Sequence, residues 1–244
     1  MRRAWLVVRS SLLWTAGVVH FVVVGTLVLL AGALVGRRRA DPLLRWGCRN
    51  VVRLTGARLK TTASPDYDPR RTCFFVANHV NIFDPFVLST AIGRRVCGLE
   101  LESHFRLPFY GWLMRRFGNV PVPDDRDPSG LKRTYRLARR AIEEGISLIV
   151  MPEGSRTLDG RVGAFEEGAF RMARTLRVPV VPVSQVGAFT LHRKGGRMLF
   201  PATVEVVLHA PVSLEGLARK DLPALVERVR EIVAAPVHAS LERQ

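Results

Sequence analysis

The amino-terminal part of the chain is one long apolar segment followed by a basic amphipathic one. From Ser10 to Gly36 there is no Asp, Glu, Lys or Arg, and this run exceeds the roughly twenty residues that a helix needs to cross a bilayer. It predicts a membrane helix, because the apolar region of a signal peptide is usually only about 7 to 15 residues long. The stretch from Pro42 to Leu59 spaces leucine, tryptophan and valine among arginines, which predicts an interfacial helix. A simple span and a pair of helices lying on the membrane both fit this pattern.

Beyond Thr61 the pattern changes to short β-branched runs that alternate with longer amphipathic segments. It predicts strands at 73–77, 96–101, 119–122, 147–151, 180–184 and 203–209. It predicts helices at 85–92, 108–117, 128–144 and 166–176, and a terminal helix at 221–244 that is interrupted at Pro236. Strands joined by helical crossovers indicate an α/β fold with a mostly parallel sheet flanked by helices. We therefore expect a membrane-associated helical region at 1–60 and one α/β domain at 61–244.

The charge of the chain favours an anionic partner. Lys and Arg total 37 against 21 Asp and Glu, which gives a formal net charge of +16, and such an excess suits nucleic acid or an acidic membrane surface. A general preference for arginine on solvated faces is the alternative source of the excess. No recognisable nucleic-acid-binding motif occurs, so we expect no nucleic acid partner. Arginines are denser after the apolar segment than before it, which predicts that the chain beyond residue 40 faces the cytoplasm.

The cysteines give no sign of a metal or disulfide framework. Cys48, Cys73 and Cys97 are widely spaced, and no pair has the spacing of a metal clip. We expect a reducing, cytosol-facing environment and no metal site.

Candidate chemistry lies in the sequence FFVANHVNIFDPF at 74–86, where four residues separate His79 from Asp84. On a continuous helix these two side chains would point about 140° apart, so a bend must join them. Asp84 followed by Pro85 is typical of an N-cap and a first helical residue, and we expect the helix to begin at Pro85. A carboxylate bound to one imidazole nitrogen would fix the tautomer and stabilise the imidazolium, as general-base catalysis requires. The alternative is a buried histidine bonded to a local cap.

A second polar loop, PEGSR at 152–156, follows another predicted strand. It places a carboxylate, a flexible glycine and a guanidinium at the carboxyl end of that strand, where the reactive residues of parallel sheets gather. Arg156 is suited to bidentate binding of phosphate. Taken alone, the loop could be a surface turn with an ion pair.

Together the two stretches resemble the Asn-His-four residues-Asp and Pro-Glu-Gly-Thr/Ser-Arg motifs of the glycerolipid acyltransferase family, which includes the 1-acyl-glycerol-3-phosphate acyltransferases. Their order and separation also match, and LPFYGWLMRRFGNVPV at 107–122 and VPVVPV at 178–183 resemble weaker family features. The resemblance implies an O-acyltransferase that moves a fatty acyl group from acyl-CoA or an acyl carrier protein to the hydroxyl of 1-acyl-glycerol-3-phosphate, giving phosphatidic acid. It implies no cofactor beyond that acyl donor, and membrane lipids and lysophosphatidic acid or a related lyso-lipid as partners. The location it implies is the cell membrane, with the catalytic domain on the cytoplasmic side.

The same resemblance assigns roles to residues. His79 is the expected catalytic base and Asp84 the group that orients it. The residues expected to bind substrate are Asn78, Glu153, Gly154, Ser155, Arg156 and Arg126. A direct attack by the acceptor needs no enzyme nucleophile, and the chain contains no Gly-x-Ser-x-Gly sequence.

Two positions depart from the family pattern. Six residues after Gly118, where relatives commonly have arginine, stands Asp124, and the nearest arginine is Arg126. Glu166 and Glu167 follow Phe165, where relatives usually have a basic residue. Carboxylates beside an acceptor phosphate would repel it, and Arg126, Arg161 and Arg171 are candidates to compensate. A different lyso-lipid acceptor therefore stays open as an alternative, as does a basic membrane-binding protein without catalysis.

Overall fold

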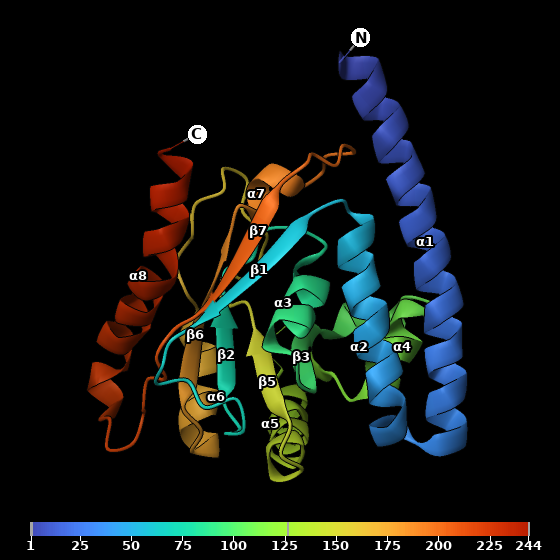
Figure 1. Cartoon of the computed structure of the whole chain (residues 1–244). Coiled ribbons are helices and arrows are strands. Elements are labelled where there is room, and N and C mark those ends of the chain that lie inside the picture. Colours follow the sequence, from blue (N-terminus) through green and yellow to red (C-terminus); the bar gives the residue numbers. More distant parts are fainter. Residues whose placement is uncertain (1, 126, 244) are drawn as a thin grey trace.

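The amino terminus forms a pair of long antiparallel helices. The computed structural model describes residues 2–125 and 127–243, and its first elements are α1 (Arg2–Val35) and α2 (Arg37–Leu54), which lie side by side (Figure 1). Gly36 joins them with a φ of 82°, a value that glycine adopts without steric cost. The chain can therefore reverse direction within one residue.

Among the described residues, seven strands form one mixed sheet at the centre of the molecule. They are β1 (Arg58–Ala63), β2 (Phe74–Ala77), β3 (Val96–Leu101), β4 (Val120–Val122), β5 (Ser147–Val150), β6 (Val180–Val186) and β7 (Thr203–Leu208). Their order is β1-β7-β6-β2-β5-β3-β4, and every neighbouring pair is parallel except β6 and β7. The expected α/β fold with a mostly parallel sheet is confirmed.

Helices cover both faces of this sheet. They are α3 (Asp84–Ile92), α4 (Tyr110–Phe117), α5 (Pro128–Glu143), α6 (Glu167–Leu176), α7 (Ala188–Leu191) and α8 (Leu222–Leu241), with short 3₁₀ turns η1 (Glu102–Arg106) and η2 (Arg219–Asp221). Side chains alternate along β2: Phe74 and Val76 pack in the core beneath α5, α6 and α8, whereas Phe75 and Ala77 pack in the core beneath α2, α3 and α7. All four are fully buried, as expected for a central strand whose successive side chains point to opposite faces.

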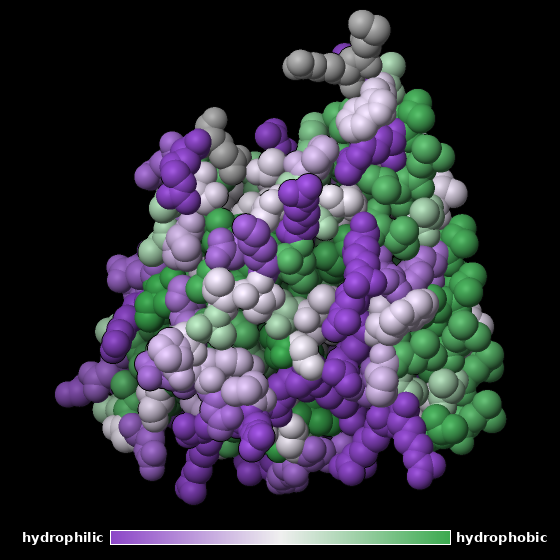
Figure 2. Space-filling view, viewed as in Figure 1, coloured by the Kyte–Doolittle hydropathy of each residue, from purple (hydrophilic) through white to green (hydrophobic). Residues whose placement is uncertain are grey.

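The inner face of α1 packs on the protein and its outer face is apolar and exposed. Val24 and Val28 are buried against Leu113 and Phe117 of α4. The large apolar residues of α1 that are about half exposed or more are Trp5, Val8, Leu12, Val18, Val19, Val23, Leu27, Leu30, Leu34 and Val35, and Figure 2 shows this hydrophobic surface along one side of the molecule. The segment Arg3–Val35 is long and apolar enough to cross a membrane, and only 22% of its most apolar window is buried. This outer face indicates association with a membrane.

Some element boundaries differ from those expected from the sequence. The second helix ends at Leu54 instead of reaching residue 59, because Gly56 takes a φ of 76° and the chain turns into β1, a strand that the hydrophobic pattern did not reveal. Since β1 begins at Arg58, the expected domain boundary at 60 falls inside a strand of the sheet. The terminal helix α8 continues through Pro236 without interruption, held by the buried side chains of Val233 and Val237.

Candidate active site

The centre of the site is a hydrogen bond between His79 and Asp84 in the loop that joins β2 to α3. The distance from His79 Nδ1 to Asp84 Oδ2 is 2.7 Å. Asp84 also accepts hydrogen bonds from the backbone N–H groups of Val80, at 2.6 Å, and Asn81, at 3.1 Å. The bend expected between His79 and Asp84 is present, and the carboxylate closes it.

Asp84 does not cap the helix in the expected way. The N-cap of α3 is Phe83, and the helix begins at Asp84 itself. The carboxylate turns back into the loop, because three donors of the loop converge there. The expectation of an N-cap at Asp84 and a helix that begins at Pro85 was therefore wrong by one residue.

This geometry sets the proton positions on the imidazole. Asp84 is fully buried and, as a carboxylate, can only accept hydrogen bonds, so Nδ1 of His79 carries the proton that it donates. When the ring is neutral, the lone pair is therefore on the other ring nitrogen, Nε2. The His79 side chain is 25% exposed, so a substrate can reach it. An imidazole held in this tautomer can remove a proton from a hydroxyl group.

Glu153 connects the two motif loops. Its Oε1 accepts a hydrogen bond from the backbone N–H of His79 at 2.7 Å, and its Oε2 accepts one from Gly163 at 2.8 Å. The N–H of Thr157 also donates to the carbonyl of His79 at 2.9 Å. Burial raises the pKa of Glu153, and the hydrogen bonds from Gly163 and His79 oppose that rise. Glu153 therefore positions the loop that carries His79.

Asn78, which was expected to bind substrate, holds β2 to β6. Its side chain is 2% exposed. Oδ1 accepts from the backbone N–H of Gln185 at 2.7 Å, and Nδ2 donates to the carbonyl of Gln185 at 3.3 Å. The Gln185 side chain in turn donates to the carbonyl of Asn78 at 2.8 Å. These bonds fix the start of the loop, and both polar atoms of the amide are engaged by the backbone of Gln185.

The remaining residues of the second motif lie on the surface beside the loop. Gly154 and Ser155 are exposed, and Gly154 has a φ of 69°, which favours glycine over residues with a Cβ. Arg156 is partly exposed and has no ion pair or side-chain hydrogen bond within residues 2–125 and 127–243. Its charge is thus available to an anion. Arg126, the other expected ligand, lies outside the described residues.

The comparison with known proteins now decides the family. The sequence profile of the Acyltransferase family matches residues 53–186. The chain belongs to the Acyltransferase family. It is 31% identical over 141 residues to a chloroplastic 1-acyl-sn-glycerol-3-phosphate acyltransferase of Brassica napus, covering 57% of this chain and 40% of that protein. It is 25% identical over 185 residues to the beta form of 1-acyl-sn-glycerol-3-phosphate acyltransferase of Homo sapiens, covering 76% and 66%.

A solved structure shares the fold of this acyltransferase-family chain. The crystal structure of the 1-acyl-sn-glycerophosphate (LPA) acyltransferase PlsC from Thermotoga maritima matches with a TM-score of 0.82 at 23% identity, over 100% of this chain and 99% of that one. Whereas the chain covers nearly all of that solved structure, it spans only about 40% of the length of the first two plant relatives that it matches.

Sequence motifs did not reveal a group of three rings beside the site. Trp14 of α1, Phe83 of the His79 loop and His192 at the end of α7 contact one another with ring centroids 5.4 to 5.7 Å apart. His192 is 3% exposed, and burial lowers its pKa, as does the charge of Arg156, while a hydrogen bond with Gly196 and the charge of Asp84 oppose this. The three rings connect α1 to the loop that carries His79 in this acyltransferase-family protein.

Proposed function

We propose that the protein is an O-acyltransferase that transfers a fatty acyl group from an acyl thioester to the hydroxyl of 1-acyl-glycerol-3-phosphate, giving phosphatidic acid. The observation that carries the proposal is the His79–Asp84 pair at the carboxyl end of β2, with the ring nitrogen Nε2 left as a base. Membership of the Acyltransferase family and the relatives named for this activity support it. The acyl donor is acyl-CoA or an acyl carrier protein, and no further cofactor takes part.

The reaction follows from the geometry of the pair. Nε2 of His79 takes the proton of the acceptor hydroxyl while the hydroxyl oxygen attacks the carbonyl carbon of the thioester. The buried carboxylate of Asp84 stabilises the imidazolium, which then gives the proton to the leaving thiolate. General-base catalysis of this kind typically contributes a factor on the order of 10² to 10⁴ in rate.

Arg156 is the residue that we assign to the acceptor phosphate. It is the cation of the second motif, and its charge acts on His192, which in turn contacts the His79 loop. Glu167, which departs from the family pattern, is held in an ion pair with Arg171 at 2.6 Å, so its charge is partly neutralised. Arg171 consequently does not supply the compensating charge that the sequence suggested at the acceptor site.

We further propose that α1 lies in the plane of the membrane instead of crossing it. Near its amino end, Arg9 and Trp14 donate hydrogen bonds to the carbonyls of Leu199 and Arg197, at 2.6 and 2.9 Å. Near its carboxyl end, Gly32 lies close to the side chain of Arg116. A spanning α1 would carry these polar contacts into hydrocarbon, where they are costly. We propose that the domain then sits on the cytoplasmic side, where the basic residues of α2 would face anionic lipid headgroups.

The decisive experiment measures transfer of a labelled acyl group to lysophosphatidic acid by purified protein in lipid vesicles. His79→Ala is expected to lose at least about 10²-fold in turnover while it stays folded and bound to the vesicles. His104→Ala is the matched control, because His104 also pairs with a carboxylate, Glu100 at 3.0 Å, but is 47% exposed.

Retention of most of the activity by His79→Ala would refute the mechanism. A panel of lyso-lipid acceptors tests the substrate separately. A marked preference for a headgroup without a phosphomonoester would select a different acceptor, the alternative that Asp124 and Glu166 suggest.

A further inference from the structure

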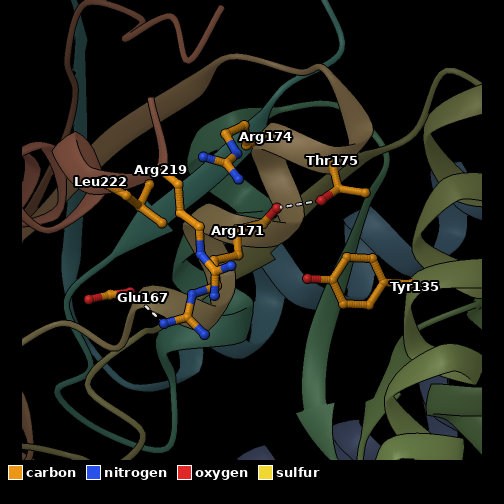
Figure 3. A pocket seen from close by; sticks show the side chains of 7 residues that line it. All are labelled: Tyr135, Glu167, Arg171, Arg174, Thr175, Arg219 and Leu222. Atoms are coloured by element: carbon orange, nitrogen blue, oxygen red, sulfur yellow. Dashed lines mark hydrogen bonds and ion pairs between the residues drawn. The ribbon is translucent and has the colours of Figure 1, made fainter. Parts of the chain in front are cut away.

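A basic pocket lies among α5, α6 and the start of α8, away from the candidate active site. Its volume is about 280 Å³. The residues that line it are Tyr135, Glu167, Arg171, Arg174, Thr175, Arg219 and Leu222, and Figure 3 shows the side chains of Arg171 and Arg219 and the hydroxyl of Tyr135 directed into the same space. The family motifs do not include these residues, and the proposed reaction does not use them.

The charge of this pocket is unbalanced. It holds three guanidinium groups and one carboxylate, and that carboxylate, Glu167, pairs with Arg171 at 2.6 Å. Arg174 and Arg219 have no side-chain hydrogen bond or ion pair within the part of the chain that the structure describes. Arg171 and Arg174 are three residues apart on α6, where like charges repel each other. A bound anion would relieve that repulsion.

The shape and the donors of the pocket suit a small molecule. Leu222 is buried and the half-buried ring of Tyr135 forms a wall, so the arginines surround a hollow and not a flat surface. A water molecule takes up roughly 30 Å³, so the pocket has room for a group several times larger. The guanidinium fork matches pairs of phosphate oxygens. Burial raises the pKa of Tyr135, with Arg171 opposing the rise, so its hydroxyl stays a donor at neutral pH.

The position of the pocket indicates that its ligand comes from the aqueous phase and not from the membrane. α5, α6 and α8 pack on one face of the sheet, whereas α2 packs on the other and α1 packs on α2. In Figure 1, α6 and α8 lie on the opposite side of the molecule from α1. When the apolar face of α1 rests on a membrane, the pocket is separated from it by the sheet.

We propose that this pocket binds a water-soluble ligand through its phosphate groups, held by Arg171, Arg174, Arg219 and Tyr135. Two sources share this chemistry: free phosphate or pyrophosphate, and the phosphate-bearing end of coenzyme A. The proposal does not depend on the acyl-transfer reaction.

The test titrates the full chain in an uncharged detergent with inorganic pyrophosphate, by calorimetry at low ionic strength. Saturable binding is expected, weakened about tenfold or more by Arg174→Gln and by Arg219→Gln. Arg228→Gln, at an exposed arginine of α8 outside the pocket, removes the same charge and should leave the affinity within about twofold. Glu167→Gln should tighten binding severalfold, because it removes the opposing charge and releases Arg171.

Further titrations distinguish the two sources of the ligand and show which results would overturn the proposal. Coenzyme A that displaces pyrophosphate and binds more than tenfold tighter would assign the pocket to coenzyme A, and equal or weaker binding would assign it to free phosphate groups. The proposal is overturned if pyrophosphate does not bind saturably, or if the pocket variants bind it as the original chain does. It is also overturned if Arg156→Gln alone abolishes binding, since the anion would then occupy the candidate active site.

Discussion

At the scale of the residue, the site depends on one buried carboxylate that serves three donors. Asp84 receives hydrogen bonds from the ring of His79 and from the N–H groups of Val80 and Asn81. The same group thus holds the ring of His79, the base in the proposed reaction, and closes the loop that carries it. Its removal should therefore affect catalysis and stability together.

Asp84→Asn removes the charge of this side chain and keeps its size, so it tests these roles without opening a cavity. The amide has one acceptor oxygen and an NH₂ group that can only donate, so at least one loop donor loses its partner and Nδ1 of His79 loses its fixed tautomer. We expect turnover to fall roughly 10²- to 10⁴-fold and the free energy of unfolding to fall by about 1 to 3 kcal/mol. Acyl-transfer rates and urea titrations measure the two effects.

Asp68→Asn is the control for that substitution. Asp68 is an exposed loop residue whose Oδ1 accepts from the backbone N–H of Arg70 at 2.8 Å, and an asparagine keeps that acceptor. Its effect on stability should stay within about 0.5 kcal/mol, with unchanged turnover. If Asp84→Asn behaves like Asp68→Asn, the carboxylate does not orient the base.

Sequence reasoning paired the residues of the candidate site that lie close in the chain but did not find their distant partners. His79 and Asp84 could be paired because the residues between them must bend, an argument that uses only local geometry. Asn78 was expected to bind substrate because of its place in the family motif, whereas its hydrogen-bond partner Gln185 is 107 positions away. Glu153 likewise depends on the register of β2 beside β5. Contacts made between distant segments carry no local signal, and the structure was needed to find them.

At the scale of the element, the site exists because β2 lies between β5 and β6. The loops after β2 and β5 then end at one edge of the sheet, which brings the two motifs together. The short β-branched runs of the sequence predicted these buried strands well. It missed β1, whose residues from Arg58 to Ala63 are mostly exposed and polar, because that edge strand is defined by its pairing with β7 and not by burial.

The contact of α1 with the His79 loop predicts that this helix affects catalysis. Trp14 touches Phe83 and His192 and donates to the carbonyl of Arg197 at 2.9 Å. Trp14→Ala removes this support, and we expect turnover to fall by up to about 10²-fold, the scale of a 1 Å displacement of reacting groups. Vesicle binding, measured by co-sedimentation, should be retained.

Trp5→Ala provides the comparison on the same helix. Trp5 is 59% exposed and therefore free to face lipid. Its loss should reduce vesicle binding without reducing the turnover of bound protein. Equal effects of the two substitutions on turnover would show that α1 only anchors the chain.

At the scale of the whole molecule, the buried His192 and the half-buried His209 make stability depend on pH. Burial lowers the pKa of His209 and, as the largest cause, of His192. Below the ordinary histidine pKa of about 6.5 the unfolded chain therefore binds protons before the folded one does. These two histidines therefore contribute to stability above the ordinary histidine pKa of about 6.5. This contribution is lost as the pH falls from that value through the lowered pKa values of the folded chain.

His209→Gln tests this dependence away from the candidate site. His209 Nε2 lies 2.8 Å from Ser184 Oγ, which itself donates to the carbonyl of Val233, so the ring donates and a glutamine amide can replace it. The free energy of unfolding should fall less between pH 7.5 and 5.5 in the variant, by at most about 1.4 kcal/mol per pH unit for one group. Urea titrations at both pH values measure the difference, and parallel slopes would contradict it.

The placement of α1 relative to the membrane gives the last prediction. A helix in the membrane plane leaves Arg3 and Arg38, which lie near its two ends, on the same side of the bilayer, whereas a spanning helix separates them. In a Cys48→Ser background, chosen because Cys73 and Cys97 are buried, Arg3→Cys and Arg38→Cys are each exposed to a thiol reagent that cannot cross sealed vesicles. We expect both to react from the side that carries the domain. Reaction of the two from opposite sides would require a spanning α1, and the contacts of Arg9 and Trp14 with residues 197–199 would then have to break in the membrane.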